Sequence, residues 1–135
     1  MPFLLDSDWV IDYLLDVPEA LQLLDRLAGE GISISVLTYM EVYQGVIRSP
    51  RSGEAEQQLR AFLQNVPILT LSLAVARRCA RLRDTLRRQG KNVNRRAIDL
   101  LIAATALELD VPVVTRNFSD YRDIPGLKLY TPPQG

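Results

Sequence analysis

Short apolar runs alternate along this chain with longer stretches in which apolar residues recur at helical spacing. The short runs predict β-strands at residues 3–5, 32–36, 67–71 and 111–114, and a further edge strand at 128–130. The longer stretches predict helices at residues 8–15, 18–28, 38–46, 54–64, 72–89 and 94–109. This alternation predicts an α/β fold with a mostly parallel sheet.

Two polar residues are expected at the starts of the last two long helices. Ser72 precedes one helical stretch and Asn94 the other, and both residue types favour the N-cap position. The polar segments 49–53 and 90–94 are expected to form loops.

The composition narrows the chemistry. The 135 residues suit a single domain over residues 1–135, with 16 Lys and Arg balanced by 16 Asp and Glu. Nucleic-acid binding would therefore depend on local rather than overall charge.

One cysteine and no histidine exclude an internal disulfide and the Ser-His-Asp and Cys-His mechanisms, and fit a reducing cytoplasm. No segment approaches the ~20 apolar residues of a membrane span, so no membrane partner is expected.

Acidic residues follow the first predicted strand directly. Sites in open α/β sheets lie beyond the carboxyl ends of the strands, and Asp6 stands in that place. Ser7 or Asp8 is expected to cap the next helix. A single cap does not need two carboxylates, so we favour a functional role for Asp6 and leave the role of Asp8 open.

Glu41 lies one turn into the helix after the second strand. Thr38 and Glu41 fit the S/T-x-x-E capping box, in which the glutamate bonds back to the start of the helix. Taken alone, this residue favours capping slightly over catalysis.

Asp99 interrupts the otherwise apolar stretch 97–104. If Asn94 caps this helix, Asp99 lies beyond the first turn, where dipole effects have faded. A carboxylate in such surroundings needs a partner. A salt bridge to Arg95 or Arg96 is one interpretation, and metal ligation is the interpretation we favour.

Asp120 follows the last predicted strand within a few residues. An ordinary turn explains it about as well as a functional role does, while Thr115 and Asn117 offer side-chain oxygens to a water or a metal.

Two carboxylates ~4 Å apart repel by about 4 kcal/mol at an effective dielectric constant of about 20. Several such acids at one place would require a cation, and an all-oxygen site prefers Mg²⁺ or Mn²⁺, which can orient a phosphodiester.

Four acidic motifs, in this order and spacing, resemble those of PIN-domain nucleases of the VapC toxin type. They are LLDSDWVI at residues 4–11, SISVLTYMEV at 33–42, AIDLLIAA at 97–104, and VTRNFSDY at 114–121 followed by IPGL at 124–127. Each motif is weak alone, and together they are specific.

The resemblance implies a three-layer α/β/α sandwich around a mostly parallel sheet of four or five strands. It also implies Mg²⁺- or Mn²⁺-dependent cleavage of RNA, a homodimer, and inhibition by a small antitoxin like VapB. It maps the metal-binding and catalytic acids onto Asp6, Glu41 and Asp99, with Asp120 as the fourth. Asn117 stands where many relatives outside the toxin group carry an acid, which leaves the fourth ligand and a second metal open.

Basic residues cluster before Asp99, and most of them are explained by a solvated helix face. A few are candidates for contacts with RNA phosphates. The cluster comprises Arg77, Arg78, Arg81, Arg83, Arg87, Arg88, Lys91, Arg95 and Arg96. Tyr43, Val46 and Ile47 are candidates to face an antitoxin, although core packing explains them better.

Two other functions compete with the nuclease. Residues 6–10 also fit the D-x-D-x-[TV] opening of haloacid-dehalogenase-like phosphatases, in which Asp6 would be the nucleophile. That family's later lysine and acidic pair have no convincing match. A receiver domain lacks its acid after the third strand, at Leu71-Ser72. The remaining alternative is a non-catalytic binding module whose acids serve as caps and salt bridges.

Overall fold

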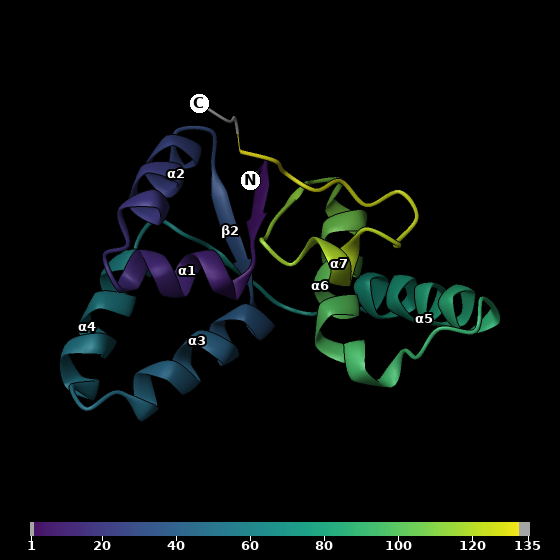
Figure 1. Cartoon of the computed structure of the whole chain (residues 1–135), viewed down its shortest axis with the longest axis horizontal. Helices are drawn as coiled ribbons and strands as arrows, with labels where there is room; N and C mark the ends of the chain where they lie inside the picture. The colour runs from purple at the N-terminus through teal and green to yellow at the C-terminus, as the bar shows by residue number, and fades with distance from the viewer. Residues whose placement is uncertain (1, 133–135) are drawn as a thin grey trace.

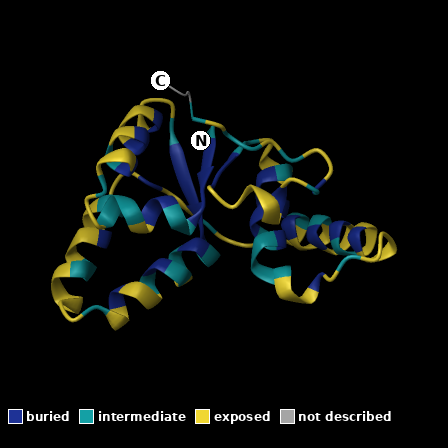
Figure 2. Cartoon of the chain, in the orientation of Figure 1, coloured by how far each residue is buried: buried dark blue, intermediate teal, exposed yellow. Residues whose placement is uncertain are grey.

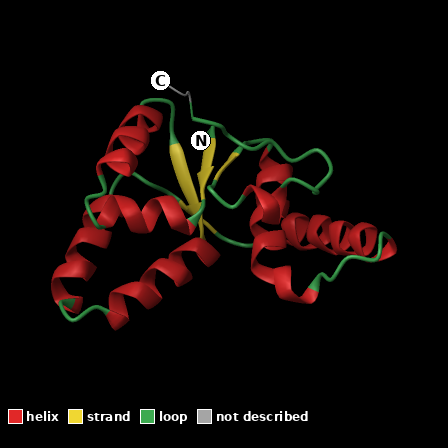
Figure 3. Ribbon diagram, in the orientation of Figure 1, coloured by secondary structure: helices red, strands yellow, loops and turns green. Residues whose placement is uncertain are grey.

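A parallel sheet forms the centre of the computed structural model, which describes residues 2–132. Within these residues the sheet has four strands: β1 (Phe3–Leu5), β2 (Ile32–Ser35), β3 (Ile68–Leu69) and β4 (Val113–Val114). Their order is β3-β2-β1-β4, and every neighbouring pair is parallel (Figure 3). The predicted α/β class and parallel sheet are confirmed.

Helices cover both faces of this sheet. Figure 1 shows α1 (Ser7–Leu14), α2 (Pro18–Ala28), α3 (Val36–Arg48) and α4 (Ser52–Leu63) on one side. The other side carries α5 (Leu73–Arg88), α6 (Ala97–Leu109) and the short α7 (Phe118–Tyr121). The predicted three-layer sandwich is therefore confirmed. Within residues 2–132, no helix combines the length and the apolar character needed to cross a membrane.

Each face of the sheet has its own core, because neighbouring strand residues point to opposite faces. Phe3 and Leu5 of β1 join the cluster under α1–α4, whereas Leu4 joins the cluster under α5–α7. In β4, Val114 joins the cluster under α1–α4, and Val113 joins the cluster under α5–α7. Figure 2 shows β1, β2 and β4 buried between the two helical layers, whereas edge strand β3 is partly exposed.

Two predicted strands are shorter than their apolar runs. The runs at 67–71 and 111–114 pair only at Ile68–Leu69 and Val113–Val114. Pro67 and Pro112 precede these pairs directly and have no N–H to donate to a neighbouring strand. The predicted edge strand at 128–130 is reduced to one isolated parallel bridge between Leu129 and Val113.

Helix capping corrects three expectations. Ser72 caps α5 as predicted, since its hydroxyl accepts a hydrogen bond from the N–H of Val75. Asn94 does not cap α6: it opens a 3₁₀ turn (Asn94–Arg96), and α6 begins at Ala97. Asp99 consequently lies in the first turn of α6, not beyond it. The cap of α1 is Asp6 itself, rather than Ser7 or Asp8.

The capping box proposed for α3 is also wrong. Ser35 caps this helix, because its hydroxyl accepts the N–H of Leu37 at 3.1 Å. Thr38 lies inside the helix, fully buried, and its hydroxyl has no partner among the described residues. Glu41 is therefore left without the capping role that its spacing suggested.

Candidate functional site

The carboxyl ends of β1 and β4 lie side by side and present the first two site residues. The N–H of Asp6 donates to the carbonyl of Val114 at 2.9 Å. Asp6 thus follows β1 at the same edge where Thr115 follows β4. Because the strands are parallel, α3 after β2 also begins at this edge, and it carries Glu41.

Asp6 is held by three donors and is only 4% exposed. Its Oδ1 accepts the N–H of Ser7 at 2.9 Å. Its Oδ2 accepts the hydroxyl of Thr115 at 2.8 Å and lies 3.3 Å from the hydroxyl of Tyr121. Burial raises the pKa of Asp6, and the charge of Asp99 raises it further, against the lowering effect of these donors. The three hydrogen-bond donors fix the orientation of the Asp6 carboxylate.

Asp99 is half-buried and faces the same hydroxyl. Its Oδ1 lies 3.2 Å from the Oη of Tyr121. Burial raises the pKa of Asp99, and the charge of Asp120 adds to this effect. The predicted alternative, a salt bridge to Arg95 or Arg96, is absent from the described residues: Arg96 instead pairs with Asp123 at 2.6 Å.

Glu41 lies within the electrostatic reach of both acids. Burial is the largest cause of its raised pKa, followed by the charge of Asp6. The charges of Asp99 and Asp8 act in the same direction, and the Ser7 hydroxyl opposes them. Asp6, Glu41 and Asp99 are therefore brought to one region of the molecule.

Asp8 has a different role, because backbone groups occupy both of its carboxylate oxygens. Oδ1 accepts the N–H of Trp9 at 2.8 Å, and Oδ2 accepts the N–H of Arg116 at 2.7 Å. This acid therefore connects α1 to the loop after β4.

The last segment contributes less directly. Asp120 is exposed on α7 and acts on the site through its charge, which raises the pKa of Asp99. Thr115 is buried, donates to Asp6, and accepts the N–H of Asn117 at 3.0 Å. Asn117 itself is exposed at the start of α7.

Tyr121 is the site residue that the sequence did not single out. It is fully buried, and its hydroxyl lies within hydrogen-bonding distance of both Asp6 and Asp99. The available signal was a bulky aromatic residue in the polar stretch 116–123. Such a residue is usually assigned to the core, and its ring does pack there.

The oxygen donors of this region match the chemistry of a hard divalent cation. Such ions prefer carboxylate and hydroxyl oxygens, and the mutual repulsion of the acids favours a cation between them. Among residues 2–132, no three acids or cysteines lie close enough, as placed, to ligate one ion together. The donor set thus fits a divalent ion in type, without forming a complete ligand shell.

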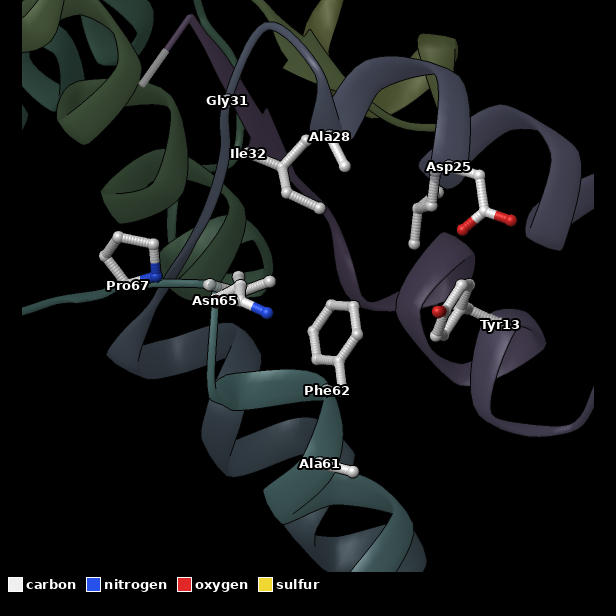
Figure 4. A pocket seen from close by; sticks show the side chains of 11 residues that line it. Tyr13, Asp25, Ala28, Gly31, Ile32, Ala61, Phe62, Asn65 and Pro67 are labelled. Carbon is white, nitrogen blue, oxygen red and sulfur yellow. The ribbon is translucent and has the colours of Figure 1, made fainter.

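A large pocket lies elsewhere on the molecule. It has a volume of about 380 Å³ and is lined from α1, α2 and α4 (Figure 4). The rings of Tyr13 and Phe62 stand in it 5.3 Å apart, and its acid is Asp25. None of the clustered acids lines this pocket, so it is distinct from the candidate site.

Known proteins share this sequence pattern over nearly the whole chain. The model of the PIN domain family matches residues 3–126. Ribonuclease VapC19 of Mycobacterium tuberculosis is 31% identical over 127 residues, which are 93% of this chain and 96% of that protein. The tRNA(fMet)-specific endonuclease VapC of Salmonella typhimurium is 26% identical over 129 residues, 96% of each chain.

Solved structures of VapBC complexes contain chains with the same fold as this chain. A chain of VapBC2 from Rickettsia felis, bound to a DNA fragment from its promoter, superposes with a TM-score of 0.85 and 26% identity. The match covers 96% of this chain and 98% of that one. A chain of DNA-bound VapBC from Salmonella typhimurium also gives 0.85, at 25% identity, covering 96% and 97%. On this agreement in sequence, length and fold, the chain belongs to the PIN-domain family and, within it, to the VapC ribonucleases.

Proposed function

We propose that this chain is a metal-dependent endoribonuclease that hydrolyses RNA phosphodiester bonds as the toxin of a toxin–antitoxin pair. The observation that carries the proposal is the convergence of Asp6, Glu41 and Asp99, from three separate segments, at one edge of the sheet. Such a cluster is costly without a cation. The VapC ribonucleases that resemble the chain support RNA as the substrate class.

The proposed cation is Mg²⁺, or Mn²⁺ in its place. Asp6, Glu41 and Asp99 would hold it, with Asp120, Asn117 or Thr115 contributing directly or through water. When bound, the ion would polarise the phosphodiester and lower the pKa of an attacking water. Support comes from the all-oxygen donors and from the raised pKa of each of the three acids.

The residues around the site hold these acids in place. Thr115 and the N–H of Ser7 orient Asp6. The Oδ2 of Asp99 accepts no hydrogen bond within residues 2–132, which leaves it available to a ligand. Together these residues keep one carboxylate fixed and present an open oxygen of the other.

The proposed partner is a small VapB-like antitoxin. The proposed assembly is a homodimer in the cytoplasm, in which residues 1–135 of each chain form one domain. The VapBC complexes among the structural neighbours support the antitoxin. Of the apolar residues considered for this contact, Val46 is buried in the core and Tyr43 stacks on Tyr39. Ile47, at 65% exposed, is the one of these three with most of its surface free.

The phosphatase alternative is disfavoured by the relatives, which are VapC ribonucleases over at least 93% of this chain. The later lysine and acidic pair of the phosphatase family also have no convincing match in the sequence. A non-catalytic binding module is disfavoured by the ribonucleases among the relatives.

The test is RNA cleavage by the purified chain, with Mg²⁺, with Mn²⁺ and with a chelator. Asp99→Asn is expected to reduce metal-dependent cleavage at least about 100-fold, because even indirect partners of metal sites contribute about 10- to 100-fold. Asp110→Asn is the matched control. Asp110 is an exposed aspartate at the end of the same helix, and its left-handed backbone suits asparagine.

Cleavage that persists in the chelator, or that Asp99→Asn leaves intact, would overturn the proposed function. Release of phosphate from small esters without RNA cleavage would favour the phosphatase.

A further inference from the structure

One buried tyrosine hydroxyl contacts two acids that repel each other. The Oη of Tyr121 lies 3.3 Å from the Oδ2 of Asp6 and 3.2 Å from the Oδ1 of Asp99. The residue is fully buried, and its ring packs in the core beneath α5 and α6. The tyrosine therefore has a packing role through its ring and a separate contact role through its hydroxyl.

The hydroxyl can donate only one proton, yet it faces two acceptors. Burial raises the pKa of Tyr121, and the charges of Asp6 and Asp99 raise it further. Both distances exceed the ~2.5–2.7 Å of a strong hydrogen bond from a hydroxyl to a carboxylate. Such distances are expected when one donor is shared between two anions.

The two acids depend on this donor to different degrees. Asp6 also receives the N–H of Ser7 and the hydroxyl of Thr115. Within residues 2–132, Tyr121 is the only hydrogen-bond donor to Asp99. Asp99 is also in the first turn of α6 without receiving a backbone N–H there. Its orientation toward Asp6 therefore depends on the tyrosine.

We propose that Tyr121 is a positioning residue of the metal site, whose hydroxyl holds Asp6 and Asp99 in the mutual orientation that a divalent cation needs. The inference rests on the proposed function. Hydrogen bonds from neighbouring groups to ligands typically tune metal sites, because they orient the ligands before the ion arrives. Here one hydroxyl would orient two ligands that lie far apart in the sequence.

The alternative is that Tyr121 only fills the core. Tyr121→Phe separates the two possibilities, because phenylalanine keeps the ring and removes only the hydroxyl. Tyr130→Phe is the matched control. Tyr130 packs edge-on against Phe3 at the start of β1, at the edge of the sheet opposite Asp6.

The measurement is the dissociation constant for Mn²⁺, obtained by titration calorimetry of the whole chain without RNA. Tyr121→Phe is expected to raise this constant about 10-fold or more, with unchanged circular dichroism, whereas Tyr130→Phe leaves it at the wild-type value. RNA cleavage by Tyr121→Phe should approach the wild-type rate once Mn²⁺ is saturating, because the defect lies in holding the ion.

The outcomes distinguish this inference from the proposed function. If the wild-type chain binds Mn²⁺ and cleaves RNA while Tyr121→Phe binds the ion equally well, the inference is wrong and the function stands. If the wild-type chain binds no divalent ion, both are wrong. A loss of cleavage by Tyr121→Phe that excess Mn²⁺ does not restore would also overturn the positioning role.

Discussion

The carboxylate of Asp8 joins the first turn of α1 to the loop after β4 by accepting the backbone N–H of Arg116 at 2.7 Å. The guanidinium of Arg116 strengthens this junction, since it lies 3.7 Å from the centre of the Trp9 ring and forms an ion pair with Asp12. The junction holds Asp6 and Thr115 beside each other at the edge of the sheet. Asp8 thus supports the site without offering it a free oxygen.

Asp8→Asn should therefore reduce the free energy of unfolding while leaving the rate of RNA cleavage nearly unchanged. The amide of asparagine can accept only one of the two N–H groups, from Trp9 and Arg116, that now meet the carboxylate. We expect a loss of about 1–3 kcal/mol in the free energy of unfolding, measured by urea denaturation. Asp25→Asn, at an exposed position of α2, should stay within about 0.5 kcal/mol of wild type.

RNA cleavage per folded molecule of Asp8→Asn should remain close to wild type. A folded variant without activity would show instead that Asp8 belongs to the catalytic group.

Whether Thr38 or Ser35 caps α3 decides how substitution of each residue changes the stability of the protein. Because the buried hydroxyl of Thr38 has no partner among the described residues, Thr38→Val should stabilise the protein by about 1 kcal/mol. Ser35→Ala removes the observed cap and should cost about 1 kcal/mol. A capping box at Thr38 would instead make Thr38→Val destabilising and Ser35→Ala nearly neutral. Thermal or urea unfolding of the two variants decides between these outcomes.

Asp99 should make the metal-free protein less stable at neutral pH. Its pKa is raised in the folded state, so the folded state binds the proton more tightly than the unfolded state does. The stability linked to this proton is present below the ordinary value of 3.8 and is lost as the pH rises through the folded pKa. Asp99→Asn, which cannot ionise, should raise the melting temperature at about pH 7 by a few degrees at most.

This gain should disappear as the pH falls below 3.8, where wild-type Asp99 is protonated in both states. Asp123 acts in the opposite sense, because Arg96 and Lys91 hold its pKa at about 2, but it contributes equally to both proteins. Melting curves in a chelator, compared at each pH, isolate the Asp99 effect. A variant less stable than wild type at neutral pH would contradict the raised pKa that burial, with the charge of Asp120, gives Asp99.

A few arginines of α5 are candidates for contacts with RNA phosphates. Residues 77–96 hold nine arginines and lysines and a single acid, Asp84. Arg78, Arg88, Lys91 and Arg96 form ion pairs within the protein. Arg77, Arg81 and Arg87 are exposed and have no ion pair within residues 2–132.

Changing these three arginines to glutamine should weaken RNA binding and reduce its salt dependence, by about 0.7 in the logarithmic slope for each phosphate that the protein no longer neutralises. Binding is measured at several salt concentrations in the Asp99→Asn background, so that RNA stays intact. The control changes Arg26, Arg48 and Arg60, on α2, α3 and α4, in the same way. Equal losses in both triple variants would show that total charge, rather than α5, determines binding.

Much of the fold follows from local patterns. The helix at residues 18–28 and the strand at 3–5 have the predicted bounds, because proline, glycine and short apolar runs act within a few residues of their own position. Caps were less predictable. Thr38 and Asn94 had suitable neighbours in sequence, but Ser35 and the 3₁₀ turn at Asn94–Arg96 occupy the helix starts.

The sequence by itself determined which residue types the site could use: with no histidine and one cysteine, the candidates for metal ligands were carboxylates after strands and in helix starts. Only the tertiary structure decided how they are held. Tyr121 meets Asp6 across 115 positions, and Asp8 meets Arg116 across 108. Spacing along the chain sets which face of an element a side chain occupies, whereas contacts between distant segments depend on how the packed layers align.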